Sequence, residues 1–207
     1  MAADWEYHSA IASQAFESAI AATGKEGLGS PCWPAGVIAL TIDPLYAPAL
    51  LTVGSLEYQC RRIEEAMSLF MRLTSLPKEE EDLPEIIDKA GDFLLDHDDT
   101  ENALNLYLAA ERIDPEEPIY VLGSGYCLGK LGRYDESVEK HRRVVAMEPE
   151  NYEHLNDLGY SLLEAEEYEE AEEVLKRSQA LAPSDYEFPM NNLKELYERQ
   201  RMAREME

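Results

Sequence analysis

One spacing, of about 34 residues, recurs along most of this chain and constrains the fold more than any other feature. This period separates successive glycines, small residues and prolines, namely Gly91, Gly125 and Gly159, Ala103, Ser137 and Ala171, and Pro115, Pro149 and Pro183. Gly54 and Ala66 continue the series upstream of Gly91 and Ala103, with three extra residues in the connection. A fixed period of this length predicts a stack of small units, each of which needs its neighbours to bury its apolar face. Stacks of this kind typically hold other proteins, so the period favours binding over catalysis.

Each period is predicted to contain two helices. In residues 118–151 the apolar positions recur about every three or four residues on both sides of a turn at 129–132, which is typical of a pair of amphipathic helices. Pro149 ends the second helix, because proline cannot continue one. The same plan applies to residues 47–83, 84–117 and 152–185.

The small residues have a predicted packing role. We expect the glycine of each first helix and the small residue of each second helix to lie where two backbones approach closely, since a larger side chain would separate them. A bulky residue four positions after each small one is expected to fill the space between the helices, and these residues are Phe70, Tyr107, His141 and Leu175.

These features, together with Gly-Tyr at 125–126 and 159–160 and Leu-Gly-Arg-Tyr-Asp-Glu-Ser at 131–137, resemble the tetratricopeptide repeat (TPR) family. The resemblance implies an all-α, right-handed superhelical solenoid with four units at 47–83, 84–117, 118–151 and 152–185. Residues 186–207 are predicted to form a C-terminal capping helix. Residues 1–46 are predicted to be a helical N-terminal region, a degenerate repeat with helices at 5–22 and 35–44. The Gly/Pro-rich loop between them at 23–34 is either mobile or a local contact for a partner, and we favour the mobile loop.

The composition limits the partners and the compartment. The formal net charge of −25 disfavours nucleic acid and membrane surfaces and favours basic partners, while solubility alone is the plainer explanation. The charge is uneven, because residues 84–117 and 152–185 are strongly acidic and residues 118–151 are neutral. Three scattered cysteines, the lack of a signal sequence and the lack of a long apolar run predict a cytoplasmic protein.

No motif predicts catalysis, a cofactor or a metal. The glycines around Lys25 lack the order of a phosphate-binding loop. The four histidines never fall at metal-ligand spacing, and His141 is most simply a core residue between repeats. The acidic turn around His97 lacks the glycine and glutamate of a calcium loop. We therefore expect no enzyme activity, unless a partner completes a site.

The resemblance implies that the first helices line a concave groove, which is the predicted binding site for a partner. The residues offset from the glycine stripe are Leu51, Ser55, Tyr58 and Gln59 in the first unit, Asp88, Asp92, Leu95 and Asp96 in the second, Leu122, Tyr126 and Lys130 in the third, and Asn156, Tyr160 and Glu164 in the fourth. This surface suits a segment with aliphatic anchors and some lysine or arginine. The plainer alternative is that the tyrosines only fill space between helices.

The same resemblance allows one subtype of the family, which binds the C-termini of chaperones, to be tested on the residues of this chain. Repeat domains that hold chaperones ending in Glu-Glu-Val-Asp use a clamp of lysine, asparagine and arginine, whereas here the clamp positions include Asp88, Asp92, Glu153 and Asp157. These residues cannot grip a carboxylate. Two functions stay open: an adaptor that binds a protein segment, and a dedicated chaperone for secreted proteins that resembles type III translocator chaperones. A homodimer is possible.

Overall fold

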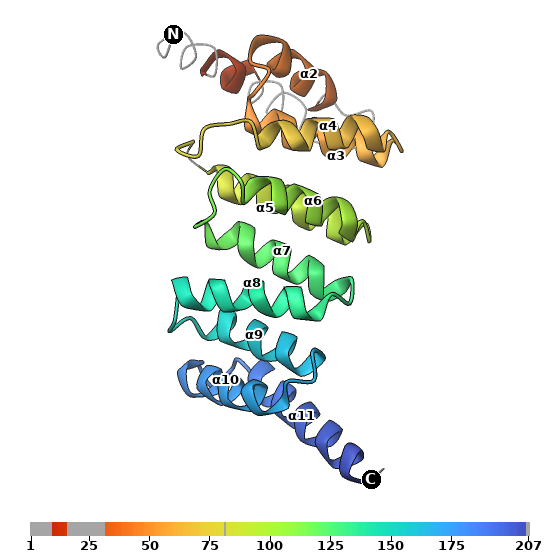
Figure 1. Cartoon of the computed structure of the whole chain (residues 1–207). Coiled ribbons are helices and arrows are strands. Elements are labelled where there is room, and N and C mark those ends of the chain that lie inside the picture. The colour runs from red at the N-terminus through yellow and green to blue at the C-terminus, as the bar shows by residue number, and fades with distance from the viewer. Residues whose placement is uncertain (1–9, 16–31, 81, 206–207) are drawn as a thin grey trace. The chain divides into compact units, whose positions relative to one another are not determined.

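The computed structural model describes residues 10–15, 32–80 and 82–205, and every regular element among them is a helix (Figure 1). The helices are α2 (Cys32–Ile42), α3 (Ala47–Gln59), α4 (Ile63–Leu73), α5 (Leu83–Asp96), α6 (Thr100–Ala110), α7 (Pro118–Lys130), α8 (Tyr134–Met147), α9 (Tyr152–Glu164), α10 (Tyr168–Leu181) and α11 (Phe188–Glu205). The predicted all-α fold is confirmed for these residues. None of the helices in the described ranges is both long and apolar enough to cross a membrane.

The chain divides into two compact units, Met1–Asp114 and Pro115–Glu207, which we call unit 1 and unit 2. In unit 1, α3 packs on α2, α4 and α5, and α5 packs on α6. In unit 2, α7 packs on α8, α8 on α9, α9 on α10, and α11 on both α9 and α10. The helices follow the predicted pairs, while the limits of the individual repeats remain a prediction.

The N-terminal region agrees only in part with the prediction. Helix α2 begins at Cys32, so residues 32–34 open a helix and do not belong to the predicted loop. The expected first helix at 5–22 is described only at residues 10–15, which are helical. Residues 23–31 of the predicted loop lie outside the described residues.

The glycines allow the first and second helices of each pair to approach closely. A Cβ atom at Gly54 would lie 2.5 Å from the Phe70 ring, and one at Gly91 would lie 2.3 Å from the Tyr107 ring. At Gly159 it would lie 2.5 Å from Leu175. Real Cβ atoms do not approach other atoms so closely, so the glycines lie at close helix contacts, as expected. The structure adds that each of these three glycines faces the bulky residue of the following helix.

The turns between paired helices also repeat. Arg61, Asp98, Gly132 and Glu166 each have a positive φ, between 58° and 72°, two residues after a first helix ends. The last three are separated by one period each, as are the glycines. Left-handed backbone lets the turn residues satisfy the last carbonyl groups of the helix. Only Gly132 adopts it without the steric cost that a side chain brings.

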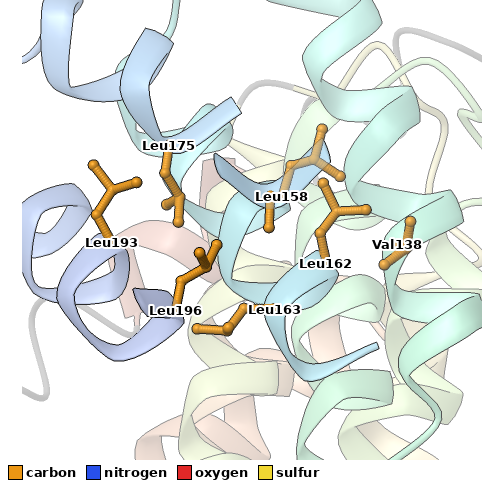
Figure 2. Packing of buried hydrophobic residues seen from close by; sticks show 8 residues of the cluster. Val138, Leu158, Leu162, Leu163, Leu175, Leu193 and Leu196 are labelled. Atoms are coloured by element: carbon orange, nitrogen blue, oxygen red, sulfur yellow. The ribbon is translucent and has the colours of Figure 1, made fainter. Parts of the chain in front are cut away.

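The core of unit 2 is a leucine-rich cluster to which four helices contribute (Figure 2). The buried residues are Val138 from α8, Leu158, Leu162 and Leu163 from α9, Ala171 and Leu175 from α10, and Leu193 and Leu196 from α11. Helix α11 therefore covers the apolar side of the last helix pair, as a capping helix does.

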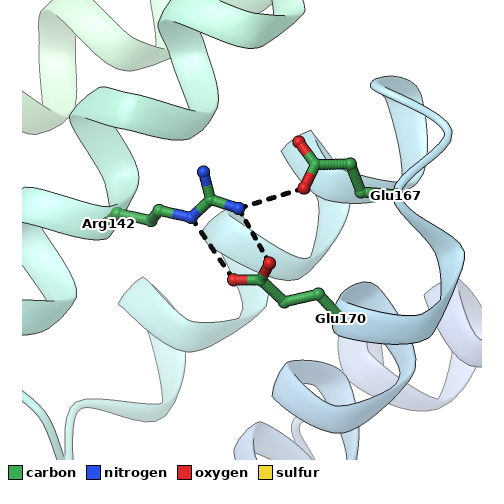
Figure 3. A network of polar contacts seen from close by, with 3 residues as sticks. All are labelled: Arg142, Glu167 and Glu170. Atoms are coloured by element: carbon green, nitrogen blue, oxygen red, sulfur yellow. Dashed lines mark hydrogen bonds and ion pairs between the residues drawn. The ribbon is translucent and has the colours of Figure 1, made fainter.

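A surface ion network also connects α8 to the start of α10 (Figure 3). The guanidinium of Arg142 lies 3.0 Å from the carboxylate of Glu167 and 2.8 Å from that of Glu170. All three side chains are about two-fifths exposed, 42% for Arg142 and 43% and 44% for the glutamates. Water screens such pairs, so the network adds little to stability.

Candidate functional site

Two tyrosines are the most exposed aromatic side chains among the predicted groove residues. Tyr126 on α7 is 54% exposed and Tyr160 on α9 is 47% exposed, and they occupy matching positions one period apart. The ammonium of Lys130 lies 5.9 Å from the centre of the Tyr126 ring, within cation–π range. Leu122 is half-buried one turn before Tyr126. Unit 2 therefore presents aromatic surface with a cation beside it.

The other predicted residues of α9 are tied to α11. Asn156 is buried, and its amide oxygen accepts a 2.9 Å hydrogen bond from Asn192. Glu164 forms a 2.6 Å ion pair with Arg199. Burial, followed by the nearby carboxylates of Glu164 and Glu195, raises the pKa of Tyr160. Asn156 and Glu164 thus help to position α11, and Tyr160 is the predicted groove residue of this helix that is exposed.

In unit 1 the predicted aspartates of α5 have different roles. The carboxylate of Asp88 accepts a 2.8 Å hydrogen bond from the hydroxyl of buried Tyr107. Asp92 is exposed, and the partial withdrawal of its carboxyl from water, then the charges of Asp88 and Asp96, raise its pKa. Leu95 is half-buried beside them. The face of α5 therefore carries crowded negative charge.

Tyr58 of α3 does not lie on an open surface. It is 9% exposed, packs edge-on against Phe93 and His97 of the next pair, and donates a 2.9 Å hydrogen bond to Asp99. Burial, the hydrogen bond and the charge of Asp99 raise its pKa to about 12. Leu51 and Ser55 are half-buried, and the Ser55 hydroxyl donates to the Leu51 carbonyl at 2.9 Å. Tyr58 is therefore a packing residue, whereas Leu51 and Ser55 are only half-buried.

A buried polar network in unit 2 was not foreseen from the sequence. Nδ1 of His141 lies 2.8 Å from the Ser161 hydroxyl, and the Ser137 hydroxyl donates a 2.8 Å bond to the Gly125 carbonyl. The two hydroxyl groups are 3.1 Å apart. A hydroxyl beside an imidazole is also the arrangement of an activated nucleophile. Here His141 is 4% exposed and Ser137 is fully buried, so a substrate has no access to them.

An aromatic cluster at the junction of α10 and α11 was also missed. The ring centres of Tyr152 and Tyr186 are 4.9 Å apart, and those of Tyr186 and Phe188 are 5.1 Å apart. Tyr152 and Tyr186 are themselves separated by one period, which is the signal that could have revealed the contact. In the part of the chain that the structure describes, no group of three or more His, Cys, Asp or Glu side chains could hold a metal ion.

Comparison with known proteins finds a family match over part of the chain. Residues 122–186 match the family model described as tetratricopeptide repeat. A comparison with curated proteins finds no match.

Solved structures with the same fold share little sequence with this chain. YrrB, described as a TPR protein with an unusual peptide-binding site, is 20% identical with a TM-score of 0.58, and the match covers 79% of this chain and 82% of YrrB. MamA is 14% identical with a TM-score of 0.57, over 87% and 93% of the two chains. The first TPR of Spaghetti (RPAP3), bound to the HSP90 peptide SRMEEVD, is 15% identical with a TM-score of 0.52, over 57% and 93%.

The paired helices, the close glycine contacts and the recurring turns define an α-helical repeat protein. Residues 122–186 match the tetratricopeptide repeat family, and the chain shares the fold of solved TPR proteins.

Proposed function

We propose that this chain is a non-catalytic adaptor that binds a segment of a partner protein on the first-helix faces of its units. The exposure of Tyr126 and Tyr160 carries the proposal, since the same fold buries Tyr58, Tyr107 and Tyr120. Exposed large apolar side chains mark interaction surfaces when they are grouped, and tyrosine is enriched among residues that dominate binding energy. Matching positions on successive first helices would contact side chains spaced along one segment.

The charge of unit 1 supports a basic partner. The carboxyl groups of Asp88, Asp92 and Asp96 crowd one side of α5, and after burial the charges of Asp88 and Asp96 raise the pKa of Asp92 further. A lysine or arginine from a partner would lower this cost, whereas an acidic peptide would increase it. The similar RPAP3 domain is bound to a peptide that contains two glutamates and an aspartate. We propose the opposite charge preference for this chain.

The test of the aromatic face uses a partner recovered from a native cell extract and then peptides made from it. We expect the double variant Tyr126→Ala, Tyr160→Ala to bind the active peptide at least tenfold more weakly than the wild type by fluorescence polarisation. Tyr197→Ala is the matched control, because Tyr197 is 44% exposed on α11 and lies outside the predicted face. Equal affinity of the double variant and the wild type would place the binding surface elsewhere.

The test of the charge preference uses Asp92 and Asp96, which are exposed on α5. Asp88 is unsuitable, because its removal would leave the buried Tyr107 hydroxyl without its 2.8 Å acceptor. We expect Asp92→Lys, Asp96→Lys to weaken binding of the same peptide, and added salt to weaken binding to the wild type. Insensitivity to both changes would refute a basic partner.

A further inference from the structure

A groove of about 560 Å³ lies between α10 and α11 at the C-terminal end of unit 2, and we call it the α10–α11 groove. Its most buried lining residue is Leu193, which is 7% exposed, and Met190 and Tyr197 beside it are 50% and 44% exposed. The hydroxyl of Tyr197 donates a 2.9 Å hydrogen bond to Glu172 of α10, which holds the ring at the boundary between the two helices. The groove therefore has a preformed, apolar base.

The α10–α11 groove is separate from the first-helix face that carries Tyr160. Asn192 and Arg199 connect α11 to α9 through hydrogen bonds. The groove residues of α11 follow a different stripe, which contains Met190, Lys194, Tyr197 and Arg201. At 3.6 residues per turn, this stripe lies about half a turn around the helix from Asn192 and Arg199. The groove therefore faces away from α9, and a second helix, α10, forms its other wall.

In the preceding pair, the corresponding side of the first helix is covered by a helix. Leu193 stands one period after Gly159, where a Cβ atom would lie 2.5 Å from Leu175 of α10. Helix α11 is the last helix in the part of the chain that the structure describes, so no described helix covers it in the same way. A leucine in place of glycine also keeps any such helix at a greater distance. The space suits a helix that packs on the Leu193 side chain.

Positive charge surrounds this groove in a strongly acidic chain. Three of its eight lining residues are cationic, Lys176, Lys194 and Arg201, and one, Glu198, is acidic. In the whole chain, acidic residues outnumber basic ones by 43 to 18. A surface that only keeps the chain soluble would follow the composition of the chain, whereas the groove reverses it. Its charge is thus complementary to an acidic ligand.

Two of the three cations are available to a ligand. Lys176 is already ion-paired within α10. Lys194 forms no ion pair with the residues that the structure describes, and Arg201 has only an exposed contact at 3.8 Å with the next turn of α11. The helix dipole does not explain these two residues, since the base in the last turn of α11 is Arg204. Lys194 and Arg201 are two turns apart, which places them about 10 Å from each other along the helix.

We propose that the α10–α11 groove binds an acidic amphipathic helix of a partner protein. Leucine or methionine side chains on one side of that helix would pack on Met190, Leu193 and Tyr197. Carboxylates two turns apart on the same helix would pair with Lys194 and Arg201. This site does not depend on the function proposed above, and each can be tested without the other.

The experiment titrates the full chain, with its methionine methyl groups labelled with ¹³C, and follows binding by NMR. The probes are three synthetic peptides of about twelve residues, a helical length that covers the stripe from Met190 to Arg201. The first has leucine at helical spacing and glutamate elsewhere, the second has glutamine in place of glutamate, and the third has serine in place of leucine. We expect the first peptide to shift the Met190 methyl signal saturably and to leave that of Met71, on α4 in unit 1, unchanged. The other two peptides should bind at least tenfold more weakly.

Paired variants test the two cations. Lys194→Gln, Arg201→Gln should weaken binding of the first peptide at least tenfold, to the level of the glutamine peptide. Lys89→Gln, Arg112→Gln is the matched control, because it removes the same charge from two exposed residues of unit 1 and should leave binding unchanged. All four residues are exposed, so both double variants should fold as the wild type does.

The proposal is overturned if the glutamate and glutamine peptides bind equally, because the groove would then be selective only for apolar side chains. It is also overturned if the serine peptide binds as tightly as the first, if Met190 does not respond, or if the two double variants behave alike. A Met190 signal that moves on dilution of the chain alone would show that a second copy occupies the groove, and this too would refute an acidic partner helix.

Discussion

Acid should destabilise unit 2 through His141, which is buried in the network with Ser137 and Ser161. Burial, and then the nearby His154, lower the pKa of His141 from 6.5 to about 4. The folded chain therefore keeps the imidazole neutral, while the unfolded chain binds a proton as soon as the pH falls below 6.5. The unfolded state holds more protons between pH 6.5 and 4, so stability falls as the pH falls through this window.

The size of the effect follows from the two pKa values. A shift from 6.5 to about 4 corresponds to about 3 kcal/mol of unfolding free energy once the pH is below both values. At pH 5 the loss is about 2 kcal/mol, because the unfolded imidazole is then almost fully protonated and the folded one is not.

The perturbation is His141→Leu, since the chain itself places Leu175 at the matching position of the next repeat. The variant loses the 2.8 Å contact to Ser161, whose hydroxyl keeps Ser137 at 3.1 Å as a partner. A comparison of the two proteins is essential. Burial raises the pKa of Asp157 to about 6, so its protonation stabilises the folded chain over an overlapping range of pH. Measured on the wild type by itself, this gain would hide the loss of stability caused by His141.

The assay is urea unfolding followed by circular dichroism at pH 7, 6 and 5, with both proteins at one ionic strength. We expect the wild type to lose about 2 kcal/mol relative to His141→Leu between pH 7 and pH 5. Parallel pH profiles of the two proteins would refute the reasoning, as would an NMR titration in which the His141 imidazole of the folded chain protonates at its ordinary pKa.

Three further predictions concern packing, turns and surface charge. Gly91→Ala should cost about 1–3 kcal/mol in thermal unfolding, because the new Cβ would lie 2.3 Å from Tyr107, a side chain held by burial and by Asp88; an unchanged Tm would contradict the close contact. Glu166→Gly should stabilise by about 0.5–1 kcal/mol in urea unfolding, because φ is 63° there, and a loss of stability would count against the left-handed turn. Arg142→Ala should change the unfolding free energy by less than about 1 kcal/mol, and a larger loss would show that its exposed network matters more than screening allows.

The fold was largely predictable because one physical requirement recurs at a fixed spacing. Gly91 must be small where Tyr107 lies, and Gly159 where Leu175 lies, so the pairing of first and second helices could be inferred from residue size alone. The start of α2 at Cys32 could not, since the Gly/Pro-rich sequence before it carries no repeat signal.

The candidate faces were predictable only in part. Helical position indicates the direction in which a side chain leaves its own helix, and this sufficed for Tyr126 and Tyr160. Helical position does not indicate which residues of other helices will cover that side chain. Tyr58 is buried because Phe93 reaches it from the next pair, and Asn156 is buried because α11 supplies Asn192. These contacts depend on residues that the period does not relate.

The recurring left-handed turns also bear on how such a chain can change length. Gly132 and Glu166 occupy the same backbone turn, and Arg133 and Glu167, which follow them, both directly precede a second helix. Excision of residues 133–166 would therefore join Gly132 to Glu167 through a turn that the chain already makes. Duplication of the same stretch would insert a whole helix pair in register. A gene encoding this protein can thus gain or lose a complete module by one in-frame event, and each event would add or remove one first-helix face without the need for a new connection.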